Sequence, residues 1–156
     1  MILGIDPGLA NTGWAVLKDE RTLVDCGCFR TKIENSSAIR LYQIYTELEQ
    51  IINKYGVREV AIESLYFAKN AKSAIKVAEA IGVLKVCGQK SGIEVKEYTP
   101  LQVKMALVGY GRAEKEQVEM MVRNFLGRSE PIKPGHASDA VAVALTHLFT
   151  ARLKVA

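Results

Sequence analysis

Three apolar segments near the N-terminus, each closed by a turn signal, constrain the fold of this chain more than any other feature. Residues 2–6 form a short apolar run that stops at Asp6-Pro7-Gly8. Residues 12–18 and 22–31 fit two further strands, separated by the polar residues 18–21. Strands joined by such short connections pair with one another, so we expect an antiparallel meander at the start of the chain.

The rest of the sequence alternates between helical and strand-like segments. In order, it predicts a helix after Ser36-Ser37 that Gly56 closes, a strand at 57–63, a helix at 71–89, a strand at 93–98, a helix beginning at Thr99-Pro100, a helix through 118–125 and a last helix over 137–153. A crossover to a parallel strand needs a covering helix. The sequence therefore predicts an α/β fold with a mixed five-stranded sheet and helices on both faces. We expect one domain over residues 1–156, because a chain of this length buries a single full core.

The predicted helix at 71–89 is rich in alanine and apolar on more than one side. Such a pattern indicates a helix that is buried on two faces. One face would pack on the sheet, and the second could be a dimer contact.

Composition narrows the classes of protein to which the chain can belong. No apolar stretch approaches the roughly 20 residues that span a bilayer, and no basic leader precedes residues 2–5, so we expect a cytoplasmic protein without membrane contact. Cys26, Cys28 and Cys87 lack the paired spacing of a zinc site. We therefore expect reduced, packed thiols rather than disulfides or structural zinc.

The net charge of +4 is distributed unevenly along the chain. Residues 66–123 hold ten Lys or Arg against six Asp or Glu, whereas residues 1–65 hold seven against nine. This asymmetry fits either an ordinary solvated helix face or a surface that binds a phosphate backbone.

Two acidic residues follow apolar strand segments. Asp6 ends the first strand, and Glu63 follows the apolar residues Val60-Ala61-Ile62. Taken alone, Asp6-Pro7-Gly8 is better explained as a simple turn. If the two strands lie side by side, however, both carboxylates meet at one sheet edge, where like charges favour a bound cation.

A third group of candidate ligands lies at the start of the last helix. His136 and Asp139 are three residues apart and project from one helix face. Helix capping is the competing explanation for these residues. His147 lies eleven residues beyond His136, roughly 16 Å along a helix, so we expect it to be a packing or surface residue. Three carboxylates and one imidazole form an oxygen-rich set suited to Mg²⁺ or Mn²⁺, and paired ions of this kind cleave phosphodiesters.

The segment after Glu63 carries the strongest nucleic-acid signal. Exposed aromatic rings stack on unpaired bases for roughly 1–3 kcal/mol, and basic side chains pair with phosphates. The candidate DNA-binding residues are Tyr66, Lys69, Lys72, Lys76, Lys104, Arg112 and Lys115. We expect one of Tyr66 and Phe67 to pack inward as ordinary core, and any one of Lys104, Arg112 and Lys115 also fits a merely solvated position.

Short motifs occur in a fixed order along residues 2–148. They are Gly4-Ile5-Asp6-Pro7-Gly8, Thr12-Gly13, Ala61-Ile62-Glu63, Ala68-Lys69-Asn70, Gln102-Val103-Lys104, Val108-Gly109, Ala113-Glu114-Lys115, Gln117-Val118, Met121-Val122-Arg123 and Ser138-Asp139-Ala140. Each tripeptide alone is weak, but in this order they resemble the signatures of the RuvC family of crossover junction endodeoxyribonucleases.

The resemblance implies a ribonuclease-H-like α/β domain that acts as a homodimer. It also implies resolution of Holliday junctions by paired symmetric nicks in DNA recombination and repair, with two Mg²⁺ ions per active site, or Mn²⁺, and with the RuvA and RuvB branch-migration proteins as partners. By motif position, the family's metal-binding catalytic residues correspond to Asp6, Glu63, His136 and Asp139. Its base-stacking aromatic corresponds to Tyr66, and basic positions near the cleaved strand to Lys104 and Lys115.

The chain departs from the common family pattern at two of these positions. His136 stands where many members have aspartate, and Tyr66 replaces a frequent phenylalanine. The first departure bears on metal preference, and the second bears on stacking.

Three other classes of protein share some of these features. A YqgF-like nuclease acting on RNA would share the Asp6-Pro7-Gly8 strand end but lack the loop at 66–72 and the basic region at 104–115. Actin-like kinases need two such domains and so a longer chain. A DNA-binding protein without catalysis would be expected to have lost part of the four-residue ligand set.

Overall fold

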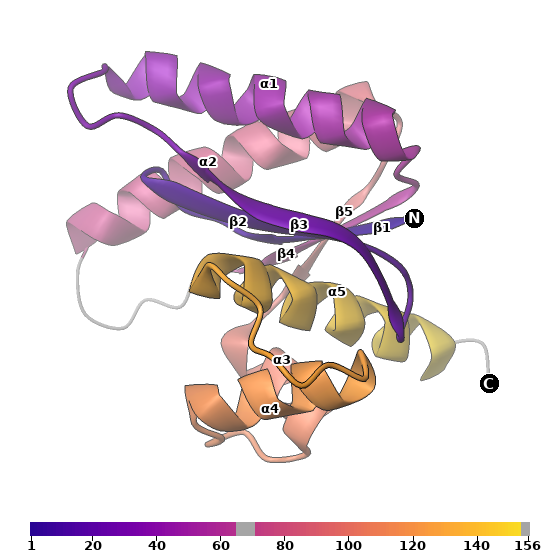
Figure 1. Cartoon of the computed structure of the whole chain (residues 1–156). Coiled ribbons are helices and arrows are strands. Elements are labelled where there is room, and N and C mark those ends of the chain that lie inside the picture. The colour runs from indigo at the N-terminus through magenta and orange to yellow at the C-terminus, as the bar shows by residue number, and fades with distance from the viewer. Residues whose placement is uncertain (65–70, 154–156) are drawn as a thin grey trace.

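The computed structural model describes residues 1–64 and 71–153, and in this part of the chain the strands form one five-stranded sheet. The strands are β1 (Ile2–Asp6), β2 (Asn11–Asp19), β3 (Thr22–Arg30), β4 (Glu59–Glu63) and β5 (Val95–Tyr98). They lie in the order β3-β2-β1-β4-β5, with an antiparallel β1-β2-β3 meander and with β4 and β5 parallel to β1 (Figure 1). The predicted meander and the mixed sheet are confirmed.

Helices cover both faces of this sheet. Within the described ranges they are α1 (Ser37–Tyr55), α2 (Ala71–Lys90), α3 (Pro100–Val108), α4 (Lys115–Phe125) and α5 (Gly135–Leu153). α1 and α2 pack together over one face, whereas α5 crosses the other face in contact with β1, β2 and β4 (Figure 1). α3 and α4 pack on the outer side of α5, so this side of the molecule has two helical layers.

Local capping residues set the ends of two predicted helices. The Ser36 side chain accepts a hydrogen bond from the backbone N–H of Ile39 at the start of α1. Gly56 ends this helix with φ at 58°, a left-handed conformation that suits glycine. Thr99 and Gln102 form a reciprocal capping box at the start of α3. The helix boundaries that the sequence predicted at these residues are confirmed.

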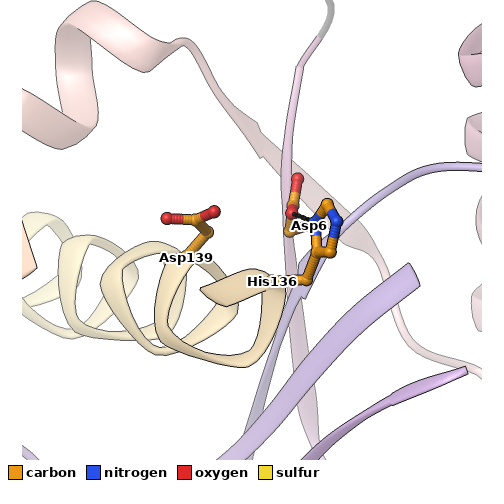
Figure 2. Close-up of side chains that lie close together, drawn as sticks. All are labelled: Asp6, His136 and Asp139. Carbon is orange, nitrogen blue, oxygen red and sulfur yellow. Dashed lines mark hydrogen bonds and ion pairs between the residues drawn. The ribbon is translucent and has the colours of Figure 1, made fainter. Parts of the chain in front are cut away.

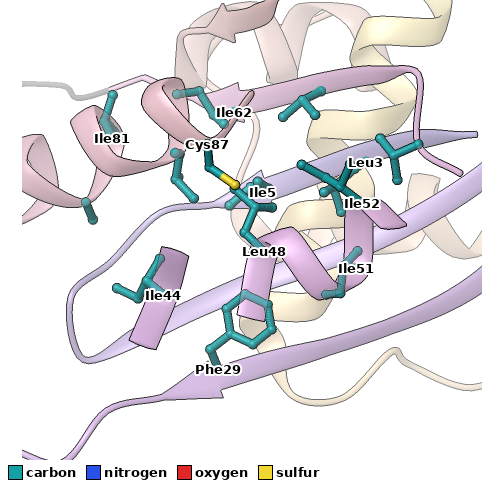
Figure 3. Close-up of a cluster of buried hydrophobic side chains, with 14 of the residues drawn as sticks. Leu3, Ile5, Phe29, Ile44, Leu48, Ile51, Ile52, Ile62, Ile81 and Cys87 are labelled. Carbon is teal, nitrogen blue, oxygen red and sulfur yellow. The ribbon is translucent and has the colours of Figure 1, made fainter. Parts of the chain in front are cut away.

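The hydrophobic core is divided between the two faces of the sheet. Because alternate strand residues point to opposite faces, Leu3 and Ile5 of β1 pack towards α1 and α2, whereas Ile2 packs towards α5. Figure 3 shows the first cluster, which includes Leu48 of α1, Ile5 of β1 and Cys87 of α2. The free thiols Cys26, Cys28 and Cys87 are buried or half-buried, as expected for packed cysteines.

α5 approaches the sheet closely because glycines face it. A Cβ atom at Gly4 would lie 2.2 Å from the carbonyl oxygen of Ala140, and one at Gly13 would lie 1.9 Å from that of His136. Both distances are far inside van der Waals contact. The glycines therefore let the beginning of α5 rest directly on β1 and β2.

α2 was expected to be buried on two faces, one of them as a possible dimer contact, and the described part of the chain covers one face. One of its faces packs on α1 and the sheet, through residues such as Leu84 and Cys87. On its other face, Ile75 is 61% exposed and Val86 is 64% exposed. Within residues 1–64 and 71–153 no element covers this outer face, and the dimer contact expected there stays a prediction.

No helix within residues 1–64 and 71–153 is long and apolar enough to cross a membrane.

Candidate active site

The two strand-end carboxylates lie at the same edge of the sheet. β1 and β4 are parallel neighbours with Ile5 opposite Ile62, so Asp6 and Glu63 follow at equivalent ends. Strands that run in the same direction present their carboxyl ends at one edge, as the sequence predicted. The start of α5 reaches this edge as well, because the helix begins at Gly135, two residues earlier than expected.

α5 adds an imidazole and a third carboxylate to this edge. Figure 2 shows His136 and Asp139 on the first turn of α5, with the His136 ring against Asp6. The Nδ1 atom of His136 lies 2.7 Å from Oδ2 of Asp6. One potential ligand atom from each of these three residues lies within 4.8 Å of the others. The structure thus brings together Asp6, His136 and Asp139 as a group that could hold a metal ion.

Glu63 lies outside that closest group but is coupled to it electrostatically. Burial raises the pKa of Glu63 to about 7, and the negative charges of Asp6 and Asp139 add to the rise. Burial also raises the pKa of Asp6, although its hydrogen bond with His136 acts in the opposite direction. The raised pKa values mean that ionised carboxylates are disfavoured there, mainly because they are buried, and a bound divalent cation would favour the ionised forms.

Two of the predicted basic residues lie next to these carboxylates. The Nζ atom of Lys115, the first residue of α4, lies 2.7 Å from Oδ2 of Asp139. This pairing raises the pKa of Lys115, and the charges of Lys115 and Lys104 partly oppose the rise at Glu63. Sequence reasoning placed Lys115 near the cleaved strand but missed its ion pair with Asp139.

Of the other predicted DNA-binding residues, three are exposed and two lie outside the described residues. Arg112 is exposed in the connection between α3 and α4, and Lys72 and Lys76 are exposed on the first turns of α2. Tyr66 and Lys69 lie outside the described residues.

His147, which sequence reasoning assigned to packing or the surface, is a buried residue of α5. Only 7% of its side chain is exposed. Its ring hydrogen-bonds with Tyr98 and Glu59 rather than with the carboxylate cluster. The prediction that it lies apart from the metal-ligand candidates is confirmed.

Comparison with known proteins shows similarity over almost the whole chain. The family model described as "Crossover junction endodeoxyribonuclease RuvC" matches residues 2–147. A curated protein of that name from Syntrophomonas wolfei is 44% identical over 155 residues, which span 97% of this chain and 90% of the relative. The similarity therefore includes every element that contributes to the candidate site.

Solved structures show the same similarity in three dimensions. A structure of Thermus thermophilus RuvC superimposes with a TM-score of 0.91 at 34% identity, covering 98% of this chain and 96% of that one. T. thermophilus RuvC in complex with a Holliday junction substrate gives the same TM-score and identity over 98% of this chain and 95% of its own.

Proposed function

Because this chain belongs to the RuvC family of crossover junction endodeoxyribonucleases, we propose that its cluster of three carboxylates and one imidazole cleaves phosphodiester bonds of Holliday junctions. The chain is a structure-specific endonuclease with the ribonuclease-H-like α/β fold. Its reaction, the resolution of four-way junctions, belongs to DNA recombination and repair. The observation that carries the assignment of the site is the convergence of Asp6, Glu63 and the first turn of α5 at one sheet edge.

The cluster would hold divalent cations through Asp6, Glu63, His136 and Asp139. Two such ions, when bound, supply an activated water and stabilise the leaving oxygen of the cleaved strand. Oxygen ligands favour Mg²⁺, whereas the imidazole of His136 tilts the preference towards Mn²⁺. Both metals remain candidates in this proposal, with two ions expected per site.

The chain's own residues prepare this centre for a cation. Burial and the acidic neighbours of Glu63 favour its protonated form, and Glu63 must lose this proton to bind a cation. Binding of a cation and ionisation of Glu63 are therefore coupled. His136 and Asp6 hold each other in place through their hydrogen bond. Lys115 neutralises part of the charge of Asp139 and is close enough to the carboxylates to contact a phosphate of the bound strand.

DNA contacts would come from the basic side chains around this edge. Lys104 and Lys115 flank the carboxylates, and Arg112 lies on the connection between their helices. We propose Lys72 and Lys76 on α2 as additional phosphate contacts. Tyr66 as a base-stacking residue and Lys69 as a phosphate contact stay predictions from the sequence.

We also propose a homodimer that uses the outer face of α2. Ile75 and Val86 are exposed there, and a two-fold dimer with one site per subunit matches the two equivalent strands cut in a junction. RuvA and RuvB as partners and a cytoplasmic location follow from family membership as proposals.

The assignment of the site is tested by separating cleavage from binding. Asp6→Asn and Glu63→Gln should each abolish cleavage of a synthetic four-way junction in Mg²⁺ or Mn²⁺. Both variants should bind the junction within a few-fold of wild type, because phosphate contacts come mainly from basic residues. Glu94→Gln is the matched control, because this exposed carboxylate precedes β5 at the end of the strand away from Tyr98 and Glu63. Cleavage by either variant at a rate near that of wild type would show that the site is assigned wrongly.

A further inference from the structure

Hydrogen bonds of the buried His147 join α5 to both strands on the Glu63 side of the sheet. The Nδ1 atom of His147 lies 2.8 Å from the hydroxyl of Tyr98, at the end of β5. Its Nε2 atom lies 2.8 Å from Oε2 of Glu59, the first residue of β4. Three elements that are far apart in sequence therefore meet at one imidazole.

The hydroxyl and the carboxylate together give both ring nitrogens a partner. A carboxylate only accepts, so Nε2–H of His147 donates to Glu59. The Tyr98 hydroxyl can donate or accept, so it can pair with Nδ1 whichever of the two groups supplies the proton. Both ring nitrogens are thus satisfied in a buried position, as buried polar groups require.

The same three residues are tied to the carboxylate cluster through the backbone. Tyr98 lies opposite Glu63 in the pairing of β4 with β5, and its carbonyl oxygen accepts a hydrogen bond from the N–H of Ser64 at 2.8 Å. Glu59 begins the strand that Glu63 ends. His147 follows Asp139 on α5 by eight residues, about 12 Å along the helix.

The remaining contacts of α5 with the sheet are unevenly distributed. α5 packs tightly on β1 and β2, with Ala140 and Ala144 against Gly4, but its contacts with β4 and β5 are far less extensive. Packing of small apolar residues is non-directional, whereas hydrogen bonds fix both distance and angle. The bonds of His147 are therefore directional constraints between α5 and β4 and β5.

We propose that His147 is a positioning residue for phosphodiester cleavage: through Tyr98 and Glu59 it fixes α5 against β4 and β5, and so fixes the spacing between the carboxylates of Asp139 and Glu63. This inference rests on the proposed function of the carboxylate cluster. It adds a residue that touches none of the reacting groups.

The test compares variants of this network with a neighbouring control. Tyr98→Phe removes only the hydroxyl, His147→Leu removes both bonds, and His147→Gln retains an N–H that can donate to Glu59. Thr146→Val is the control, because the Thr146 hydroxyl is buried in the same helix but donates to the carbonyl of Ala142 within that helix. Ile44→Val, in the core on the opposite face of the sheet, is a second control for loss of stability.

Three quantities are measured for each variant: Mn²⁺ affinity of the DNA-free protein by calorimetry, junction Kd, and the single-turnover cleavage rate at saturating junction. Tyr98→Phe and His147→Leu should weaken Mn²⁺ binding and lower the cleavage rate at least tenfold, with junction Kd within threefold of wild type. His147→Gln should recover part of both losses. Thr146→Val and Ile44→Val should keep wild-type metal affinity and rate, even where their Tm falls equally.

The inference is overturned if Tyr98→Phe, which deletes a single oxygen atom, matches the controls in Mn²⁺ affinity and cleavage rate. This variant keeps the test decisive should His147→Leu fail to fold. Asp6→Asn is measured in the same series. If Asp6→Asn still cleaves, the proposed metal site is wrong. If it is inactive while the Tyr98 and His147 variants behave like the controls, only the positioning role fails.

Discussion

Replacing Gly13 with alanine should separate stability from catalysis at the point where α5 meets the sheet. The new Cβ atom would lie 1.9 Å from the carbonyl oxygen of His136 and 2.4 Å from its carbonyl carbon. Both partners are backbone atoms, so rotation of a side chain cannot relieve the clash. The first turn of α5 must instead move away from β2.

The structure allows an estimate of the size of this movement. Ordinary contact for a Cβ atom begins near 3.4 Å, so the backbone of His136 must retreat by about 1.5 Å. Overpacking of this kind costs about 1–3 kcal/mol, which lowers Tm by about 2–4 °C per kcal/mol in a protein of this size. Misplacing catalytic groups by about 1 Å can lower a rate 100-fold, so cleavage should fall by about this factor.

The assay is single-turnover cleavage of a four-way junction at saturating protein, together with junction Kd and Tm. Ile52→Val is the control, because it costs about 0.5–1.5 kcal/mol in the core on the other face of the sheet. Gly13→Ala should bind the junction almost normally but cleave it about 100-fold more slowly, whereas Ile52→Val should cleave normally. Cleavage by Gly13→Ala within threefold of wild type would refute the argument that contact with Gly13 positions His136.

Further predictions concern His136, Glu63 and the outer face of α2. His136→Ala should nearly eliminate cleavage, whereas His136→Asp should retain cleavage with a metal preference shifted towards Mg²⁺. If the alanine variant is active in either metal, His136 is only a helix cap. With a chelator present, Tm should fall by about 5 °C as pH rises from 5 to 8, because the folded state holds a proton on Glu63 up to a pKa of about 7 while the unfolded chain releases it near 4.5. Glu63→Gln should remove most of this fall, and an unchanged slope in that variant would assign it to another group. Val86→Arg should sediment as a monomer and lose paired nicking. If this variant stays dimeric, the dimer interface does not use the outer face of α2.

Much of the fold was predictable because it depends on local signals. Asp6-Pro7-Gly8, Ser36 and Thr99 mark boundaries through turn and capping chemistry that acts over a few residues. The proximity of Asp6 and Glu63 was also predictable, since it requires only that two parallel strands be neighbours. Those inferences needed no knowledge of how helices pack.

The parts that sequence reasoning missed depend on tertiary packing. Lys115 and Asp139 are 24 residues apart and meet only because α4 and α5 cross with their first turns together. His147 meets Glu59 across 88 residues and Tyr98 across 49. An apolar helix face looks the same in sequence whether its partner is the sheet or a second molecule, so the sequence could not show which face of α2 would be exposed in this chain, as Val86 is.

The second helical layer on the α5 side is formed by α3 and α4, which lie outside the sheet. The chain leaves the sheet after Tyr98 and returns to the core with α5 at Gly135, and the α3–α4 pair between these points packs on α5. Insertions or deletions within 109–114 or 126–134 change neither strand order nor register, since both connections lie outside the sheet. Evolution can therefore vary the surface that carries Lys104, Arg112 and Lys115 by changing one continuous segment, while the strands that hold Asp6 and Glu63 stay constant.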